Sequence, residues 1–381
     1  MEKAAIIGVG MTRIEAQKSR ETFADMAWEA VNRALADAGM TIGDIDNIIT
    51  TSNDFWDGRT ISCMAVGDAS GAAGKNISCV EGDGTFGAFY GLARVLSGAY
   101  GTTLVTAHSK GSESVSSLIT NAAFDPIYDR ALGMDMITAA ALQASAYMHR
   151  TGTTSEQLAA VSVKNHGNAR ANPMAQLPME ITVADVLASE MIADPLHKLD
   201  CSPVSDACCA LIIAAEDRVA RYPARPVWIR GAAFCADAYY LGDRDLSRAD
   251  ALTTAAKKAF AMAGVGDPRQ EISLAEVYDA FTYQELLWLE AMGLCGDGEA
   301  GRLTVAGRFN RDGALPVNAS GGLLGGHPVI AAGLIRLAEA ALQVRGDAGA
   351  HQVPDVRTAL AHGVNGLCGQ SHCVWVLGDS R

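Results

Sequence analysis

The sequence has little positive charge and no long apolar run. It holds 30 Lys and Arg against 43 Asp and Glu, which gives a formal net charge of -13. A field of that sign repels phosphate backbones, so nucleic acid is excluded as an expected partner. No stretch approaches the roughly 18 consecutive apolar residues of a membrane span, and a strand-like segment at 5–9 follows the first residues directly. We therefore expect a cytoplasmic protein that does not enter a membrane.

Paired cysteine spacing is also lacking. The nine cysteines are an odd number and form no Cys-x-x-Cys pair, so neither a disulfide framework nor a metal site is predicted. We interpret most of them as small buried hydrophobic residues. Charged residues make up only 19% of the chain, against 49% hydrophobic residues and 39 glycines. That composition excludes a disordered tail and is typical of a compact α/β protein.

Strand-like and helix-like patterns alternate along the chain, and they do so twice in the same order. The corresponding segments of the first and second copies are strands at 5–9 and 227–230, helices at 22–38 and 250–263, strands at 48–51 and 274–278, helices at 84–96 and 326–342, and strands at 209–214 and 373–377. Self-similarity on this scale indicates the duplication of one unit in which helices cover a sheet.

The two copies differ by an insert in the first. We predict an N-terminal half at 1–225 and a C-terminal half at 226–381, with the insert at about 110–200. Helix patterns occur inside it at 139–147 and 156–166. A long insert with helices of its own is typical of a subdomain that covers a substrate or forms a dimer.

Several short motifs resemble, in order and spacing, the thiolase superfamily. They are Val163-Lys164-Asn165-His166, Ile192-Ala193-Asp194-Pro195-Leu196, Glu276-Val277-Tyr278-Asp279-Ala280-Phe281, Asn318-Ala319-Ser320-Gly321-Gly322 and Gly326-His327-Pro328. The chain is most similar to the sterol-carrier-linked thiolases and the bacterial lipid-transfer thiolase-like proteins. The resemblance implies a duplicated five-layer α-β-α-β-α fold, a homodimer, and action on acyl-CoA thioesters with coenzyme A as part of the substrate and no covalently bound cofactor.

The position of the thiolase nucleophile does not hold a cysteine. Thiolases carry that cysteine at the N-terminus of the helix that here begins near Gly84, where the helix end lowers the pKa of a thiol. Depending on the alignment, Glu81 or Gly84 takes its place. Cys79 is then either a displaced nucleophile or a core residue. Glu81 and Asp83 are either an auxiliary acid or base or groups that serve the helix N-terminus.

Two further positions carry the chemistry that the resemblance implies. Tyr278 stands where thiolases have the oxyanion-hole histidine, and this substitution resembles the thiolase-like steroid side-chain aldolases. His327 keeps the Gly-His-Pro motif, where an imidazole can hydrogen-bond or shuttle protons near neutral pH. Cys368 is either the second, acid-base cysteine of thiolases or a buried thiol in a glycine-rich turn. The predicted binding residues are Gly84, Ser320, Gly321 and Gly326.

The resulting hypothesis is a lyase of lipid or steroid degradation. It cleaves a β-hydroxyacyl-CoA by retro-aldol chemistry into a short acyl-CoA and a ketone, with Tyr278 as proton acceptor and His327 as enolate stabiliser or proton donor, or the reverse. Backbone N–H groups near Gly84 are expected to hold the oxyanion. The insert, with Trp56, suits a bulky apolar substrate.

The sequence also leaves two alternative functions open, and the resemblance implies an accessory protein. The first alternative is a thiolase or acyltransferase that cleaves a β-ketoacyl-CoA of the benzoylsuccinyl-CoA type through Cys79. The second is a non-catalytic carrier of acyl-CoA or lipid. Relatives in this branch also assemble with a small zinc-ribbon/OB-fold accessory protein, so the resemblance implies a heterotetramer in which the zinc belongs to the partner.

Overall fold

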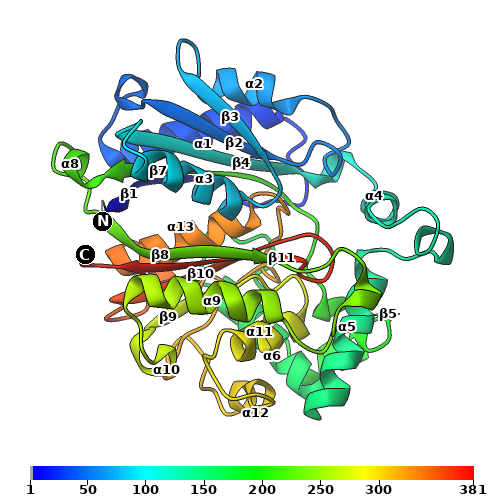
Figure 1. Cartoon of the computed structure of the whole chain (residues 1–381). Helices are drawn as coiled ribbons and strands as arrows, with labels where there is room; N and C mark the ends of the chain where they lie inside the picture. Colours follow the sequence, from blue (N-terminus) through cyan, green and yellow to red (C-terminus); the bar gives the residue numbers. More distant parts are fainter. Residues whose placement is uncertain (1–2) are drawn as a thin grey trace.

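Helices and strands stack in alternating layers in the computed structural model, which describes residues 3–381 (Figure 1). Helices α1 (Phe23–Ala38) and α2 (Ser62–Ala69) cover one half of the sheet from outside, and α9 (Asp250–Ala263) and α11 (Thr282–Ala291) cover the other half. Helices α3 (Gly84–Leu96) and α13 (Ala332–Arg345) lie between the two halves and contact both. The predicted fold class, an α/β protein of thiolase type with alternating layers, is confirmed.

One nine-stranded sheet runs through the molecule in the order β3-β2-β4-β7-β1-β8-β11-β10-β9. The strands are β1 (Ala4–Met11), β2 (Asn47–Ser52), β3 (Asn76–Glu81), β4 (Thr102–Lys110), β7 (Asp206–Ala215), β8 (Val227–Ala236), β9 (Leu274–Glu276), β10 (Thr358–Asn365) and β11 (Ser371–Gly378). Only Ala5 with Trp228 and Ile6 with Val227 pair β1 to β8, and the two sheet layers meet there. Outward from this junction, β7-β4-β2 mirrors β11-β10-β9, as a duplicated unit would.

Local capping explains why the outer helices begin and end where the sequence predicts. The hydroxyl of Thr22 accepts a hydrogen bond from the N–H of Asp25, and the Asp25 carboxylate accepts one from the N–H of Thr22, which closes a capping box at the start of α1. Gly39 and Gly264 end α1 and α9 with φ of 64° and 69°. Glycine adopts this left-handed conformation without a steric penalty.

Two predicted elements of the second half were too long, and helices α10 (Pro268–Glu271), α11 and α12 (Ala300–Val305) and one strand were missed. The helix expected at 326–342 begins only at Ala332, because the preceding loop satisfies its backbone with side chains: Ser205 accepts from the N–H of His327, and Asp279 from that of Leu323. The strand expected at 274–278 ends at Glu276, so Tyr278 lies in the loop beyond it. The missed strand is β10, which pairs with β9 and β11.

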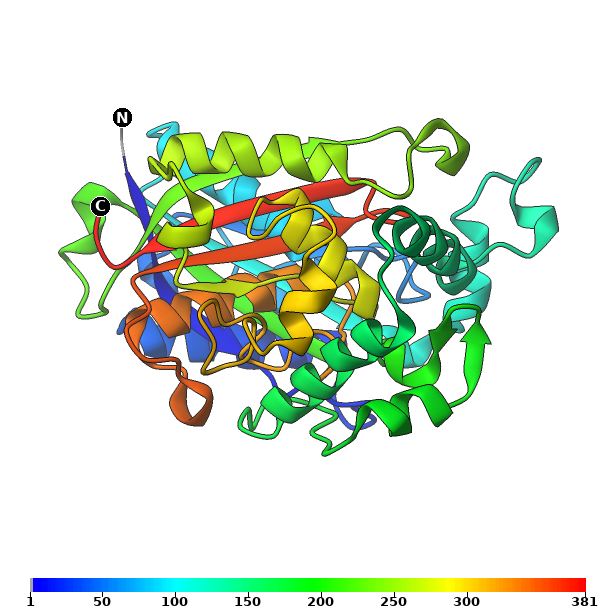
Figure 2. The same cartoon turned by 90° about the horizontal axis from the view of Figure 1, so that it is seen from below.

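The insert lies between β4 and β7 and packs on one side of the molecule. Its elements are α4 (Ser116–Ala122), α5 (Met136–Thr151), α6 (Ser155–Ala169), α7 (Val183–Ala188), β5 (Met191–Ala193) and β6 (Leu196–His197). Helices α5 and α6 contact α11, whereas α4 projects from the body at the end opposite to the termini (Figures 1 and 2). The remaining helix is α8 (Glu216–Val219). Within residues 3–381, none of the helices combines the length and the apolar character needed to cross a membrane.

Candidate active site

A cavity of about 400 Å³ collects residues from both halves and from the insert. Tyr278, His327, Glu81, Asp83 and Cys368, which the sequence singled out as candidate catalytic residues, all line it. Most of the remaining wall is apolar. Its apolar side chains include Phe55, Trp56, Ile119, Met136, Ile137, Phe281, Val329, Ile330, Val364 and Leu367. The fold therefore brings the five candidates to one hollow, although the chain separates them widely.

Tyr278, His327 and Ser202 form a hydrogen-bonded row on the cavity wall. The Oη atom of Tyr278 lies 2.9 Å from Nε2 of His327, and the Oγ atom of Ser202 lies 2.8 Å from Nδ1. The phenol and imidazole rings meet edge to face, with centroids 5.4 Å apart and an interplanar angle of 88°. Both nitrogens of the imidazole thus have a hydroxyl partner.

Burial keeps the tyrosine and the histidine neutral. Burial, together with the positive charge of Arg336, lowers the pKa of His327 to about 3. Burial also raises the pKa of Tyr278 well above its ordinary value of 10, with the negative charges of Asp83 and Asp279 adding to the rise. A neutral imidazole has one donor and one acceptor nitrogen. Because a phenol is a stronger acid than an alcohol, we assign the Tyr278 O–H as donor to Nε2 and the Nδ1–H as donor to Ser202.

Backbone contacts hold the three side chains in place. The carbonyl of Tyr278 accepts a hydrogen bond from Nε1 of Trp288 at 2.9 Å. The N–H of Ser202 donates to the carbonyl of Ala280 at 2.9 Å, and this contact ties the insert to the loop that carries Tyr278. The N–H of His327 donates to Oγ of Ser205 at 2.8 Å. The row is therefore fixed by elements from three parts of the chain.

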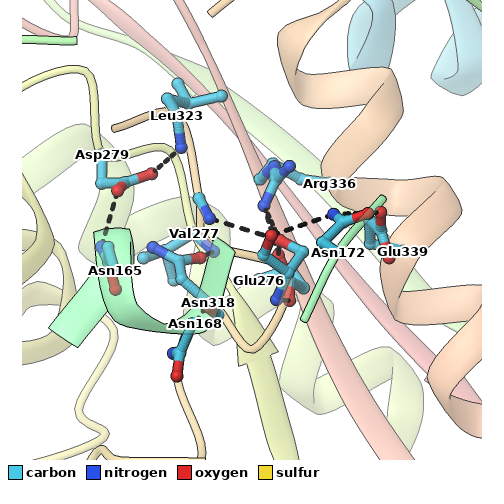
Figure 3. Close-up of polar contacts among 12 residues, drawn as sticks. Asn165, Asn168, Asn172, Glu276, Val277, Asp279, Asn318, Leu323, Arg336 and Glu339 are labelled. Carbon is cyan, nitrogen blue, oxygen red and sulfur yellow. Dashed lines mark hydrogen bonds and ion pairs between the residues drawn. The ribbon is translucent and has the colours of Figure 1, made fainter. Parts of the chain in front are cut away.

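A buried polar network joins the loop before α13 to the end of β9 (Figure 3). Asp279 accepts hydrogen bonds from the N–H of Leu323 at 2.6 Å and from Nδ2 of Asn165 at 2.7 Å. The N–H of Val277 donates to Oδ1 of Asn318 at 2.8 Å. Burial, with the charge of Glu285, raises the pKa of Asp279 to about 7. The residues on either side of Tyr278 are thus anchored to the loop that carries His327.

An ion pair completes this network where α13 passes between the two sheet layers. Arg336 pairs with Glu276, and both side chains are almost fully buried. Ser320 donates to Glu276 from its hydroxyl at 2.6 Å and from its N–H at 3.1 Å. These contacts explain why two charges are tolerated there, since buried charges need partners.

The residues predicted to bind the ligand through their backbone lie outside the cavity wall. Ser320 belongs to the polar network just described. Gly321 has a φ of 99° and packs so closely on Ala169 that an added Cβ would lie 2.6 Å from the alanine Cβ. A Cβ on Gly326 would lie 2.7 Å from Cγ2 of Ile14. The small size of the two glycines serves the packing of the His327 loop, and ligand binding at these positions stays a prediction.

The backbone donor expected to hold the oxyanion at the start of α3 already has a hydrogen-bond partner within the protein. The N–H of Gly84 donates to the carbonyl of Ile330 at 2.8 Å, so it is not free for a thioester oxygen. Asp83 caps the helix and accepts from the N–H groups of Thr85 at 2.9 Å and Gly333 at 2.7 Å. Burial raises the pKa of Asp83 to about 6. Glu81, by contrast, is solvent-exposed at the end of β3.

Two of the nine cysteines lie on the cavity wall, and Cys79, the displaced nucleophile considered above, is not one of them. Cys79 is exposed on β3, with its Sγ atom 3.6 Å from Oγ of Ser52. Cys368 and Cys201 line the cavity, and burial raises the pKa of each thiol to about 12. Both are therefore thiols rather than thiolates near neutral pH, and thiolate is the nucleophilic form. Among the described residues 3–381, no group of three or more His, Cys, Asp or Glu side chains is arranged to hold a metal ion.

Sequence reasoning missed several polar residues of the wall, among them Ser202, Gln284 and Asn365. Ser202 lies 125 residues from His327 in the chain, and its neighbours Cys201 and Pro203 form no motif that marks it. Asn365 ends β10, and its side-chain amide lies against Gly82, where an added Cβ would come within 2.7 Å of Nδ2. Only the strand pairing of β10 brings this amide to the site.

Comparisons with known proteins find similarity to thiolases and to thiolase-like proteins. Residues 233–379 match a family described as thiolase C-terminal domain-like. The chain is 36% identical over 380 residues to an acetyl-CoA acetyltransferase of Methanothermobacter thermautotrophicus, covering 97% of this chain and 98% of that protein. It is 30% identical over 385 residues to sterol carrier protein 2 of Homo sapiens, covering 95% and 70%. The solved structure of the Ltp2-ChsH2(DUF35) aldolase superposes with a TM-score of 0.86 and 28% identity, covering 100% of this chain and 98% of that one.

Proposed function

The chain belongs to the thiolase superfamily, in its sterol-carrier-like branch, and from that premise we propose that it is a carbon–carbon lyase which cleaves a β-hydroxyacyl-CoA by retro-aldol chemistry. The observation that carries the proposal is the hydrogen-bonded pair of Tyr278 and His327 in the cavity. The two thiols on the same wall are protonated near neutral pH, which suits a reaction without an acyl-enzyme. The aldolase of similar structure supports the same reaction class.

The geometry suits a proton relay rather than a tyrosinate base. With its pKa raised by burial, Tyr278 stays protonated near neutral pH. Tyr278 takes the proton of the substrate β-hydroxyl while it passes its own proton to Nε2 of His327. The bond between the α- and β-carbons then breaks, its electron pair becomes the enolate of the short acyl-CoA, and the β-carbon becomes the ketone. His327 returns the proton to the α-carbon, which closes the cycle without a co-reactant.

The developing enolate oxygen needs a donor other than Gly84. The side-chain amides of Asn365 and Gln284 line the cavity, and we propose Asn365 as this donor because it lies beside Gly82, next to the start of α3. Asp83, with its pKa raised to about 6, serves as an auxiliary proton carrier near neutral pH. Glu81 is exposed and stays outside the proposed relay.

The direct test is turnover of a β-hydroxyacyl-CoA whose hydroxyl-bearing carbon carries a bulky apolar group. We expect equimolar ketone and short acyl-CoA, detected by mass spectrometry, and about a 10²- to 10⁴-fold lower rate in Tyr278→Phe. The matched control is Tyr283→Phe, which removes a buried phenol hydroxyl that bonds to Gln143 outside the cavity wall. Unchanged cleavage by Tyr278→Phe would overturn the proposal.

A second candidate is an acyltransferase that cleaves a β-ketoacyl-CoA through a cysteine. It is favoured by the 36% identity to a protein named acetyl-CoA acetyltransferase and by the presence of two thiols on the cavity wall. Cys79 lies off that wall, so Cys201 and Cys368 are the thiols through which it would act. A trapped thioester that maps to either residue by peptide mass spectrometry would establish this candidate. Tight binding of acyl-CoA with no turnover of either substrate class would instead indicate a carrier.

We further propose that the chain works as a homodimer together with a small zinc-ribbon/OB-fold protein. The support is the aldolase of similar structure, whose name pairs it with ChsH2(DUF35), and the open edge of the sheet at β3. Co-purification from the native host tests the second protein, and light scattering of the purified chain tests the dimer. Full activity of the isolated chain would remove the accessory protein from the proposal.

A further inference from the structure

The charges on the cavity wall all have one sign. Three carboxylate residues line the cavity, Glu81, Asp83 and Asp135, and none of its lining residues within 3–381 is Lys or Arg. Asp135 caps α5 by accepting from the N–H of Thr138 at 2.8 Å, so it is held at the wall. A ligand in this cavity therefore meets negative charge and no cation.

The basic side chain that contacts the glycine-rich turn of the wall is bonded to backbone carbonyls and paired with Asp237. Arg244 donates to the carbonyls of Leu367 at 2.9 Å and Cys368 at 2.6 Å, and it lies outside the wall itself. Its guanidinium braces the turn that holds Cys368. It is not placed to pair with a charge inside the cavity.

Most of the uncharged part of the wall is apolar, and both the insert and the second half contribute to it. Ile119 on α4 and Met136 and Ile137 at the start of α5 line the cavity together with Phe281 and Leu367 from the second half. Such a surface favours hydrocarbon, because burial removes apolar area from water. A carboxylate placed there would lose its hydration and gain no cation to pair with.

We infer, resting on the proposed function, that the site selects β-hydroxyacyl-CoA esters with an uncharged, apolar acyl group and rejects those that carry a second carboxylate on that group. The carboxylates that face the cavity oppose an anionic acyl end by repulsion as well as by desolvation. The phosphates of coenzyme A do not enter this argument, because two esters that share the coenzyme differ only in the acyl end. Substrates with a dicarboxylic acyl group are thereby excluded as a class.

The experiment compares two probes on the full-length protein by calorimetry. The probes are octanoyl-CoA and the CoA monoester of the eight-carbon dicarboxylic acid, with free CoA as reference. We expect octanoyl-CoA to bind about 100-fold more tightly than its carboxylated analogue, since the latter carries an unpaired charge into the cavity. Equal binding within about threefold, or tighter binding of the carboxylated ester, would overturn the inference, because neither fits an unpaired buried charge. So would a failure of octanoyl-CoA to bind more tightly than CoA.

A variant that adds a positive charge to the cavity wall, with a matched control, tests whether the preference for the uncharged acyl group arises at that wall. Ile119→Lys adds a cation to the cavity wall, whereas Leu118→Lys adds the same charge one position away, where the side chain is 69% exposed and lies off the wall. In Ile119→Lys the new cation can pair with the carboxylate of the analogue, so we expect octanoyl-CoA to bind only about tenfold more tightly than the analogue, or less. We expect Leu118→Lys to leave the difference in affinity unchanged. The same response in both variants would contradict the inference.

The binding experiments can fail or succeed independently of the test of the proposed lyase reaction. Neither probe carries a β-hydroxyl group, so the binding preference is measured whether or not the protein cleaves a carbon–carbon bond. Charge selectivity without turnover would refute the lyase and leave the inference standing. Turnover of a β-hydroxyacyl-CoA without charge selectivity would do the opposite.

Discussion

Tyr278 and His327 meet at 2.9 Å between Oη and Nε2, although 49 residues separate them in the chain. The contact joins the loop after β9 to the loop before α13, and each loop is held by buried polar groups rather than by a helix or strand. Because burial keeps both rings neutral, their hydrogen bond can carry a proton from one to the other without a net charge in the resting site. Five predictions follow from this site and its supports.

Replacing His327 tests the relay at its proton acceptor. His327→Gln keeps a polar side chain near Ser202 but cannot hold the relayed proton, and we expect about a 10²- to 10⁴-fold loss in kcat. Since the pKa of His327 is lowered to about 3, its imidazole is neutral between pH 5 and 8. The pH–rate profile of the native protein should therefore show no limb from His327 between pH 5 and 8. A limb in that range that vanishes in His327→Gln would contradict the relay.

Ser202 is a positioning residue, because it acts on the substrate only through His327. Ser202→Ala removes the partner of Nδ1, and we expect roughly a tenfold fall in kcat with KM almost unchanged, since a misplaced tautomer affects the chemical step. The ¹⁵N shifts of the His327 ring should also show a changed tautomer population. Ser202→Thr restores the hydroxyl and should restore most of the rate. A loss that the threonine variant does not rescue would point to a packing defect instead.

The cavity thiols are predicted to be dispensable. Burial raises the pKa of both Cys201 and Cys368 to about 12, so neither supplies a thiolate near neutral pH. We expect the double variant Cys201→Ala/Cys368→Ala to retain more than about a tenth of the lyase activity, since alanine keeps the small apolar volume. Cys79→Ala, on the exposed face of β3, should be fully active. Loss of all turnover in the double variant would favour the acyltransferase.

Asp83 should make folding stability depend on pH. Its folded-state pKa is raised from 3.8 to about 6 by burial, so the folded protein binds this proton more tightly than the unfolded chain. The native protein therefore loses stability relative to Asp83→Asn as the pH rises from 4 to 6, by about 2 to 4 kcal/mol in the free energy of unfolding. Denaturant unfolding of both proteins at pH 4, 5, 6 and 7 measures the difference. If the native protein instead became more stable relative to Asp83→Asn as the pH rises, the raised pKa of Asp83 would be contradicted.

Removing one partner of the buried ion pair between Arg336 and Glu276 should destabilise the folded protein strongly. Arg336→Met leaves the Glu276 carboxylate unpaired in the interior, and we expect a loss of about 3 to 5 kcal/mol in the free energy of unfolding. The matched control is Arg302→Met, which removes an exposed pair with Glu299 and should change stability by about 1 kcal/mol or less. The double variant Arg336→Met/Glu276→Gln should recover part of the loss. Equal effects at the two arginines would contradict the buried role of Arg336.

Helices α1 and α9 of the outer layers were predictable from the sequence because their signals are local. The apolar spacing of α1, the capping hydroxyl of Thr22 and the glycine at position 39 act within a few residues of one another, and the same holds for α9 and Gly264. The glycine-opened helix at 84–96 was predicted with the bounds that the structure has. Duplication was visible for the same reason, since each copy repeats these local signals.

The loops of the site depend on contacts that no local pattern records. The resemblance pointed to Tyr278 and His327, yet only the fold shows that Ser202 completes their row and that the N–H of Gly84 is already taken by the carbonyl of Ile330. Hydrogen bonds of this kind form between segments that the sheet and α13 bring together. The pKa shifts of the site likewise arise from burial, which is set by everything packed around a group. Residue identity along the chain determined which chemical groups were available and which local elements they lie in, whereas long-range packing and desolvation decided their partners and their protonation.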